Sequence, residues 1–143
     1  MNLSKNTKDI VLHTYTTGCT TTASSILDLG LHNCEGVMLR HVTANTTSSV
    51  SFTLQVSAST ATASFANASY NSSTVTLAST QTASVMKIDL VKPTYRYLRT
   101  VVNSTGTANV GMVIATPYGV RVGPTTNAST HVAGELTVIS PTT

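Results

Sequence analysis

The carboxylates of this chain are few and widely spaced. Glycoside hydrolysis needs two carboxyl groups that face each other across a cleft. Asp28 and Asp89 could meet in space, but each is explained more simply as an outward strand residue or the partner of a nearby cation. The chain also has no GxSxG motif and no glycine-rich phosphate loop. We therefore expect no enzyme. The acids are Asp9, Asp28, Glu35, Asp89 and Glu135.

The residues that could bind a metal are also poorly grouped. A structural zinc site usually has ligands in closely spaced pairs, and His32-x-Cys34 alone is a weak match to that pattern. We therefore expect no metal and no cofactor. A disulfide between the two cysteines is compatible with the sequence, but free thiols are favoured for a protein made in a cytoplasm. The metal-type residues are His13, Cys19, His32, Cys34 and His41.

A third group combines tyrosines with cations, in a chain that has only eight lysines and arginines. Tyrosine and arginine are enriched in the hot spots of protein interfaces. The alternative is a solvated strand whose tyrosines tuck in their rings and leave their hydroxyls in water. The concentration of charge favours an interface with a partner or a sister subunit. This Tyr/Arg cluster consists of Lys92, Tyr95, Arg96, Tyr97, Arg99, Tyr118 and Arg121.

The composition excludes several classes of protein. Charged residues are 9% of the 143 residues, against roughly 25% in an ordinary soluble domain. The net charge of +3 comes without the dense basic stripe of a nucleic-acid binder. No segment has the roughly 18–20 apolar residues of a membrane span. The first residues lack the apolar core of a signal peptide, which predicts synthesis in a cytoplasm.

Serine and threonine make up about a third of the chain and favour strands over helices. The clearest strand is residues 50–57, where Val, Phe, Leu and Val alternate with polar residues. Residues 85–90 alternate in the same way. Residues 36–43 are mixed and indicate a strand covered on both sides.

The second half of the chain predicts a hairpin. Residues 95–102 and 110–118 are β-rich, and Pro117 should interrupt the second strand. Residues 103–109 are typical of a turn, with Gly106 supplying a positive φ.

Shorter segments complete an antiparallel sandwich of about eight strands, for which a jelly roll is the predicted topology. We expect an N-terminal arm (1–9), one β-sandwich domain (10–124) and a C-terminal tail (125–143). The shorter segments are strands over 10–15, 25–31, 64–68 and 75–77, a threonine-rich loop around Gly18, and one late strand near 136–139.

A series of motifs also runs through the second half. It comprises IDL (88–90), KPTYRYLR (92–99), GTAN (106–109) and YGVR (118–121). In this order they resemble the small head decoration (cement) proteins of tailed bacteriophages. The opening LSKN and the CEGV at 34–37 are similar too, so the resemblance extends from the start of the chain to about Pro124.

The resemblance implies a jelly roll that binds the outer surface of the assembled capsid as a dimer or trimer. The implied partners are the major capsid protein and sister copies, with no nucleic acid and no membrane. The chain departs from the family pattern in its charge-poor middle (57–84) and in a longer tail beyond Pro124.

Three other functions remain open. A head-fibre, tail or baseplate adhesin domain would bind a host surface glycan. A free carbohydrate-binding sandwich would want a tryptophan platform, and the chain has no tryptophan. A hydrolase is opposed by the absence of paired acids.

Overall fold

The computed structural model describes residues 9–14, 16–31, 34–43, 48–68, 74–77 and 84–119. Their regular structure is β-strand, apart from two short 3-10 turns, η1 (Leu29–Leu31) and η2 (Thr62–Ser64). No helix among them is long and apolar enough to cross a membrane. The strands are β1 (Ile10–His13), β2 (Thr16–Ala23), β3 (Leu27–Asp28), β4 (Gly36–Thr43), β5 (Val50–Ser57), β6 (Ala66–Asn67), β7 (Thr74–Leu77), β8 (Ser84–Val91), β9 (Tyr97–Val110) and β10 (Val113–Tyr118).

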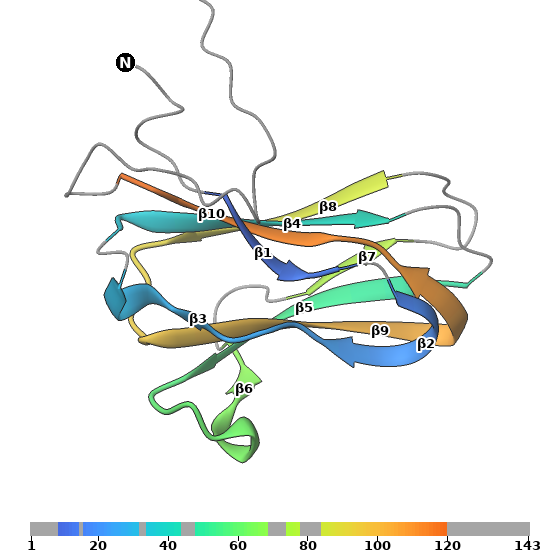
Figure 1. The fold of residues 1–143 in the computed structure, drawn as a ribbon, viewed down its shortest axis with the longest axis horizontal. Helices are drawn as coiled ribbons and strands as arrows, with labels where there is room; N and C mark the ends of the chain where they lie inside the picture. Colours follow the sequence, from blue (N-terminus) through green and yellow to red (C-terminus); the bar gives the residue numbers. More distant parts are fainter. Residues whose placement is uncertain are drawn as a thin grey trace, which may run out of the picture.

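The strands form two antiparallel sheets, which Figure 1 shows stacked as two layers. One sheet has the order β1-β10-β4-β8, and the other has the order β2-β9-β5-β6, with β3 paired to β9 and β7 paired to β5. Strands from the two ends of the chain pair with each other: β1 with β10, then β2 with β9, then β4 with β8, and finally β5 with β6 and β7. Such a rolled-up hairpin shared between two sheets is a jelly roll, so the predicted all-β sandwich is confirmed.

The core lies between the sheets and follows the predicted alternation. Val50, Phe52, Leu54 and Val56 of β5 are at most 6% exposed, as residues 50–57 predicted. The alternating polar residues were expected to face outward into solvent, but Thr53 and Ser57 are also buried. The facing strand β4 contributes three side chains with at most 1% exposed surface, Val37, Leu39 and His41. The residues between them in β4, Met38, Arg40 and Val42, point to the outer face.

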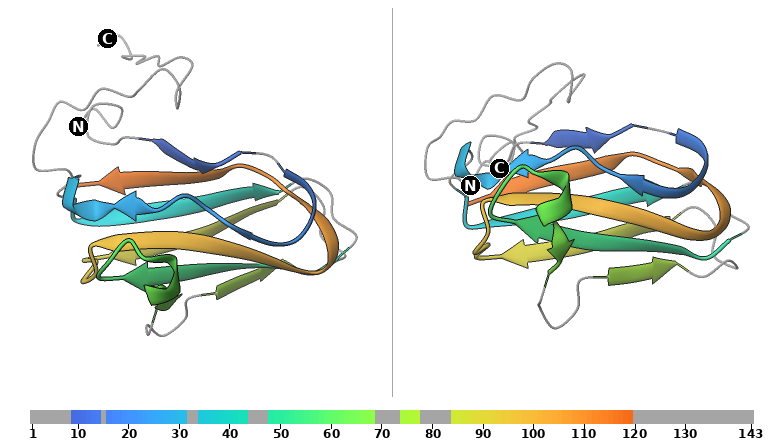
Figure 2. Two further views of the ribbon diagram at one scale, coloured as in Figure 1. Left: turned by 60° about the horizontal axis from the view of Figure 1, so that its bottom comes forward. Right: turned by 90° about the horizontal axis from the view of Figure 1, so that it is seen from below.

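The predicted hairpin in the second half is wrong. Residues 103–109 continue β9, because β5 and β2 supply backbone partners on its two sides: Asn103 pairs with both Ser51 and Thr21. Figure 2 shows the long β9 with these neighbours, and the bend by which the chain then enters β10 in the other sheet. The two β-rich runs therefore lie in different layers.

Gly106 and Pro117 also differ from prediction. Gly106 has no positive φ; its missing side chain instead makes room for Ser48, whose Oγ would lie 2.6 Å from a Cβ there. Pro117 lies within β10. The backbone of Val42 donates to the carbonyl of Met112, so by alternation the backbone of Pro117 faces away from β4. Within the described residues β1 pairs with β10 only as far as Ala115, so the missing N–H breaks no ladder bond.

Two predictions in the first half also need correction. The threonine-rich loop around Gly18 is wrong, because these residues form β2, with Gly18 at a φ of 69° next to register shifts against β9. The strand over 25–31 shrinks to β3 followed by η1.

The predicted N-terminal arm and C-terminal tail lie mostly outside the described residues, and the late strand near 136–139 lies there with the tail. Residues 120–124 of the predicted domain, which include Arg121, are also outside the described residues. Asp9 is the exception. Its carboxylate bonds Arg40 of β4 and Thr116 of β10, so this residue belongs to the sandwich rather than to an arm.

Candidate functional site

Four connections meet at one end of the sandwich, which we call the loop end. They are residues 29–31 and 34–35 between β3 and β4, 58–65 between β5 and β6, 92–96 between β8 and β9, and 118–119 at the end of β10. Three adjoining hollows of about 390, 400 and 540 Å³ lie among them. Four members of the Tyr/Arg cluster line these hollows: Lys92, Tyr95, Arg96 and Tyr118.

Arg96 is held at the loop end by Asp28. Its Nε and Nη2 donate to the two carboxylate oxygens of Asp28, each at 2.9 Å. Asp28 Oδ1 also accepts the backbone N–H of Gly30, which ties the η1 turn to the same carboxylate. The hydrogen bonds to Asp28 are the main cause that raises the pKa of Arg96. The guanidinium is thus fixed in direction and charge-compensated, and its side chain remains 57% exposed.

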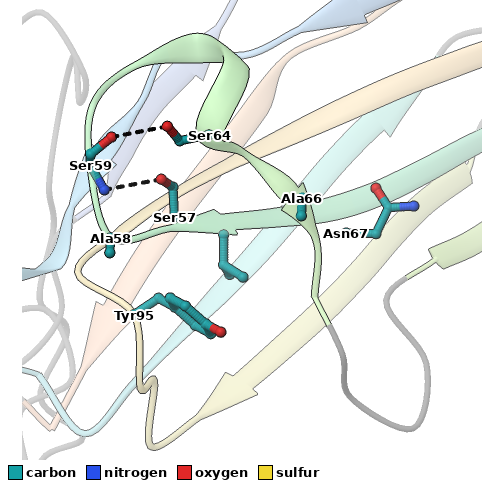
Figure 3. Close-up of a pocket in the computed structure, with 8 residues that line it drawn as sticks. Ser57, Ala58, Ser59, Ser64, Ala66, Asn67 and Tyr95 are labelled. Atoms are coloured by element: carbon teal, nitrogen blue, oxygen red, sulfur yellow. Dashed lines mark hydrogen bonds between the residues drawn. The ribbon is translucent and has the colours of Figure 1, made fainter.

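Tyr95 forms one wall of the 400 Å³ hollow, shown in Figure 3. The opposite wall is the segment between β5 and β6, where Ser59 Oγ donates to Ser64 Oγ at 3.2 Å. Ser57 Oγ accepts from the backbone N–H of Ser59 at 3.0 Å, which closes the turn. With 46% of its surface exposed, Tyr95 offers a rigid ring beside hydroxyl groups.

Tyr118 lies on the outer face of the four-stranded sheet and crosses β4 to reach β8. Its hydroxyl donates to Asp89 Oδ1 at 2.7 Å. The ring passes over Gly36, where a Cβ would come within 2.3 Å of it, so β4 needs a glycine at this position. Burial first, then the bond to Asp89 and the nearby negative charges, raise the pKa of Tyr118 to about 12.

Lys92 stands at the corner between β8 and the loop end. Its φ of 51° is in the left-handed region, and its backbone N–H donates to the carbonyl of Glu35 at 2.8 Å. The side chain is exposed and lines the hollow shared with Tyr118.

The remaining members of the cluster are placed differently. Tyr97 and Arg99 belong to β9 and face outward from the six-stranded sheet. Arg99 donates from Nε to Gln55 Oε1 at 2.9 Å and stacks over the ring of Phe65 at 4.6 Å. Arg99 therefore holds the segment before β6 against the sheet. Of the seven residues of the predicted cluster, the structure brings four together at the loop end. Tyr97 and Arg99 lie on the outer face of the six-stranded sheet instead. Arg121 lies outside the described residues.

The loop end has the chemistry of a binding surface. Among the described residues no three His, Cys, Asp or Glu side chains are close enough to hold a metal ion. Cys34, which lines two of the hollows, carries a free thiol whose pKa is raised mainly by burial. A raised pKa keeps a thiol protonated and weakly nucleophilic at neutral pH. The exposed groups that the loop end offers are the ring of Tyr95, the guanidinium of Arg96, which Asp28 holds in place, and the ammonium group of Lys92.

Sequence reasoning missed several residues of the loop end. Ser59, Ser64 and Asn67 gave no signal, because small polar residues are common throughout the chain. Gly36 gave none either, since its role depends on Tyr118, which is distant in sequence. Asp28 was the exception, as it was expected to be either an outward strand residue or the partner of a nearby cation, and it is the partner of Arg96.

The sequence matches no protein-family model, and no curated protein is significantly similar to it.

Proposed function

We propose that this protein is a capsid decoration protein, which binds the outer surface of an assembled phage head and stabilises it. Its partner would be the major capsid protein, and it would reside on the virion after synthesis in the host cytoplasm. The motifs in residues 88–121 suggest the class of partner. The observation that carries the proposal is the loop end, where Lys92, Tyr95, Arg96 and Tyr118 gather around adjoining open hollows.

The side chains of the loop end suit a protein partner. Tyr95 offers a large, exposed ring that loses little conformational entropy on binding. Asp28 holds Arg96 in one orientation, which reduces the cost of ordering a flexible cation at an interface. Lys92 adds an exposed positive charge that can meet a carboxylate of the capsid surface.

The stabilisation would be thermodynamic and would need no catalysis. A protein that binds only the expanded shell shifts the equilibrium toward that shell by mass action. If each oligomer contacts the shell at more than one point, the second contact is intramolecular and raises the overall affinity.

The direct test is co-sedimentation of the purified protein with expanded capsid shells that lack it. We expect saturable binding and a rise in the melting temperature of the shells. Absence of binding at saturating concentrations, with the protein folded, would contradict the proposal.

The hollow in Figure 3 favours one alternative, a head-fibre, tail or baseplate adhesin domain that binds a host glycan. Tyr95 and the hydroxyls of Ser59 and Ser64 could contact the apolar face and polar edge of a sugar ring. A glycan array separates the two functions. Selective glycan binding without shell binding would favour the adhesin.

A further inference from the structure

Among the described residues, β8 forms one border of the four-stranded sheet and is long and regular for an edge strand. Within the described residues β8 pairs only with β4, over eight residues and without a register shift (Figure 2). Of the other border strands, β1 and β2 contain register shifts, β6 has two residues and β7 has four. Proteins usually shorten, distort or charge their edge strands to prevent pairing with another chain. The two charged residues of β8, Lys87 and Asp89, are opposite in sign, so they do not exclude a second copy of the same strand. The long, regular β8 therefore invites a partner strand.

The backbone groups that face this edge can be assigned. The N–H of Val42 in β4 donates to the carbonyl of Met112 just before β10, so the even-numbered residues of β4 direct their backbone groups to β10 and the odd-numbered ones, such as Leu39, form hydrogen-bonded pairs with β8. Because such pairs alternate along an antiparallel ladder, the even-numbered residues of β8 direct their backbone groups to β4. The N–H and C=O groups of Val85, Lys87, Asp89 and Val91 consequently point to the open edge.

The same four residues carry the outward side chains of β8. Val85 and Val91 are 50% and 60% exposed, and Lys87 and Asp89 are exposed between them. The series Val-Lys-Asp-Val is complementary to a second copy of itself that runs in the opposite direction. When two such strands lie antiparallel, each valine faces a valine and each lysine faces an aspartate, and both kinds of pair stabilise a sheet.

We propose that two copies of this chain pair through β8, antiparallel and around a two-fold axis at Ile88. Val85 then faces Val91 of the partner subunit, and Lys87 faces Asp89 of the partner subunit. The two sheets merge into one continuous sheet across the interface, an association by strand addition. Each subunit contributes the same surface, as a two-fold interface requires.

Charge also fixes the register of this pairing. Other two-fold pairings of β8 with its copy can use the same outward N–H and C=O groups. In each of them the two-fold axis passes through a different residue of β8. Centring on Lys87 would place that lysine against its own copy, and centring on Asp89 would do the same with two carboxylates. Like charges directly opposite each other destabilise a sheet. Centring on Met86 or on Leu90 would place Lys87 or Asp89 against a valine and would pair fewer residues of β8. The arrangement centred on Ile88 is therefore the one that the side chains favour. This inference does not depend on the capsid role.

The test measures the mass of the full chain in solution by light scattering during size-exclusion chromatography, without capsid shells. We expect a dimer for the natural sequence. Lys87→Asp and Asp89→Lys should each be monomeric, because each places like charges opposite one another. Mixed in equal amounts they should form a heterodimer, in which every charged pair is again opposite in sign. Lys92→Asp makes the same change of charge just beyond β8 and should remain a dimer.

Three results would overturn the proposal: a monomer for the natural sequence at every concentration, dimers of both single variants, or no heterodimer from folded variants. Circular dichroism checks that each variant folds. Asp89→Lys also removes the acceptor of the Tyr118 hydroxyl, so Val91→Lys provides a second test. It puts a charge against Val85 of the partner subunit, and we expect loss of the dimer. Because no shell is present, failure here is distinguishable from failure of capsid binding.

Discussion

In the middle of the sandwich, Phe52 of β5 and His41 of β4 face each other across the two sheets with ring centroids 5.5 Å apart and at most 1% of their surface exposed. At the loop end, by contrast, Tyr95 and Arg96 keep about half of their surface in contact with solvent. The core holds its side chains by packing, whereas at the loop end the side chains of Arg96 and Tyr118 are held by hydrogen bonds to Asp28 and Asp89. Changes in the middle should therefore alter stability, and changes at the loop end should alter binding.

The largest effect is expected from Phe52→Ala. Phe52 is fully buried between the sheets, and truncating a buried phenylalanine costs about 3–5 kcal/mol through lost burial and the cavity left behind. Denaturant unfolding should show this loss. A change below about 1 kcal/mol would mean that the two sheets are not packed as described.

The second effect is a dependence of stability on pH. Burial, and then the nearby His13, lower the pKa of His41 to about 4, while the unfolded chain has a histidine pKa of about 6.5. Burial also lowers the pKa of His13. Stability should therefore be complete above about pH 6.5 and should fall toward pH 4, with His41 contributing on the order of 3 kcal/mol.

Among the described residues, neither ring nitrogen of His41 has a hydrogen-bond partner. His41→Leu should therefore flatten the pH profile, leaving only the contribution of His13. Equal pH dependence in urea unfolding of the natural protein and this variant would rule out His41 as the cause.

A smaller effect is expected at Gly36. A side chain there would displace the ring of Tyr118 from its path to Asp89. Gly36→Ala should cost roughly 1–3 kcal/mol, as overpacking commonly does. Tyr118→Phe, which keeps the ring and loses only the hydroxyl bond, should cost about 1 kcal/mol. A cost of Gly36→Ala well below about 1 kcal/mol would mean that the ring of Tyr118 does not pass closely over this position.

Arg96→Ala should have the smallest effect on stability, because exposed ion pairs contribute little. Its melting temperature should match that of the natural protein, while binding to capsid shells should weaken. A large drop in melting temperature would instead show that Arg96 and Asp28 hold the loop end together.

The core was predictable from sequence because its signal is local. The alternation in residues 50–57 reports which side of β5 is buried, whatever strand lies opposite. The path of β9 was not predictable in the same way, since residues 103–109 have the composition of a turn and become strand through pairing with β2 and β5. The Tyr/Arg cluster was located by residue type, but its division between the loop end and the outer face of β9 depends on contacts between distant residues. Tyr118 over Gly36 and Arg99 over Phe65 are two such contacts.

The proposed role of the loop end is tested most directly by shell binding of a variant that loses both Tyr95 and Arg96 side chains, Tyr95→Ala with Arg96→Ala. The matched control is Met112→Ala, which truncates a side chain that is 41% exposed at the opposite end of the sandwich. With all three proteins folded, co-sedimentation should show saturable binding for the natural protein and the control, and weak or no binding for the double variant. Equal binding by all three would contradict the assignment of the loop end as the capsid-binding surface.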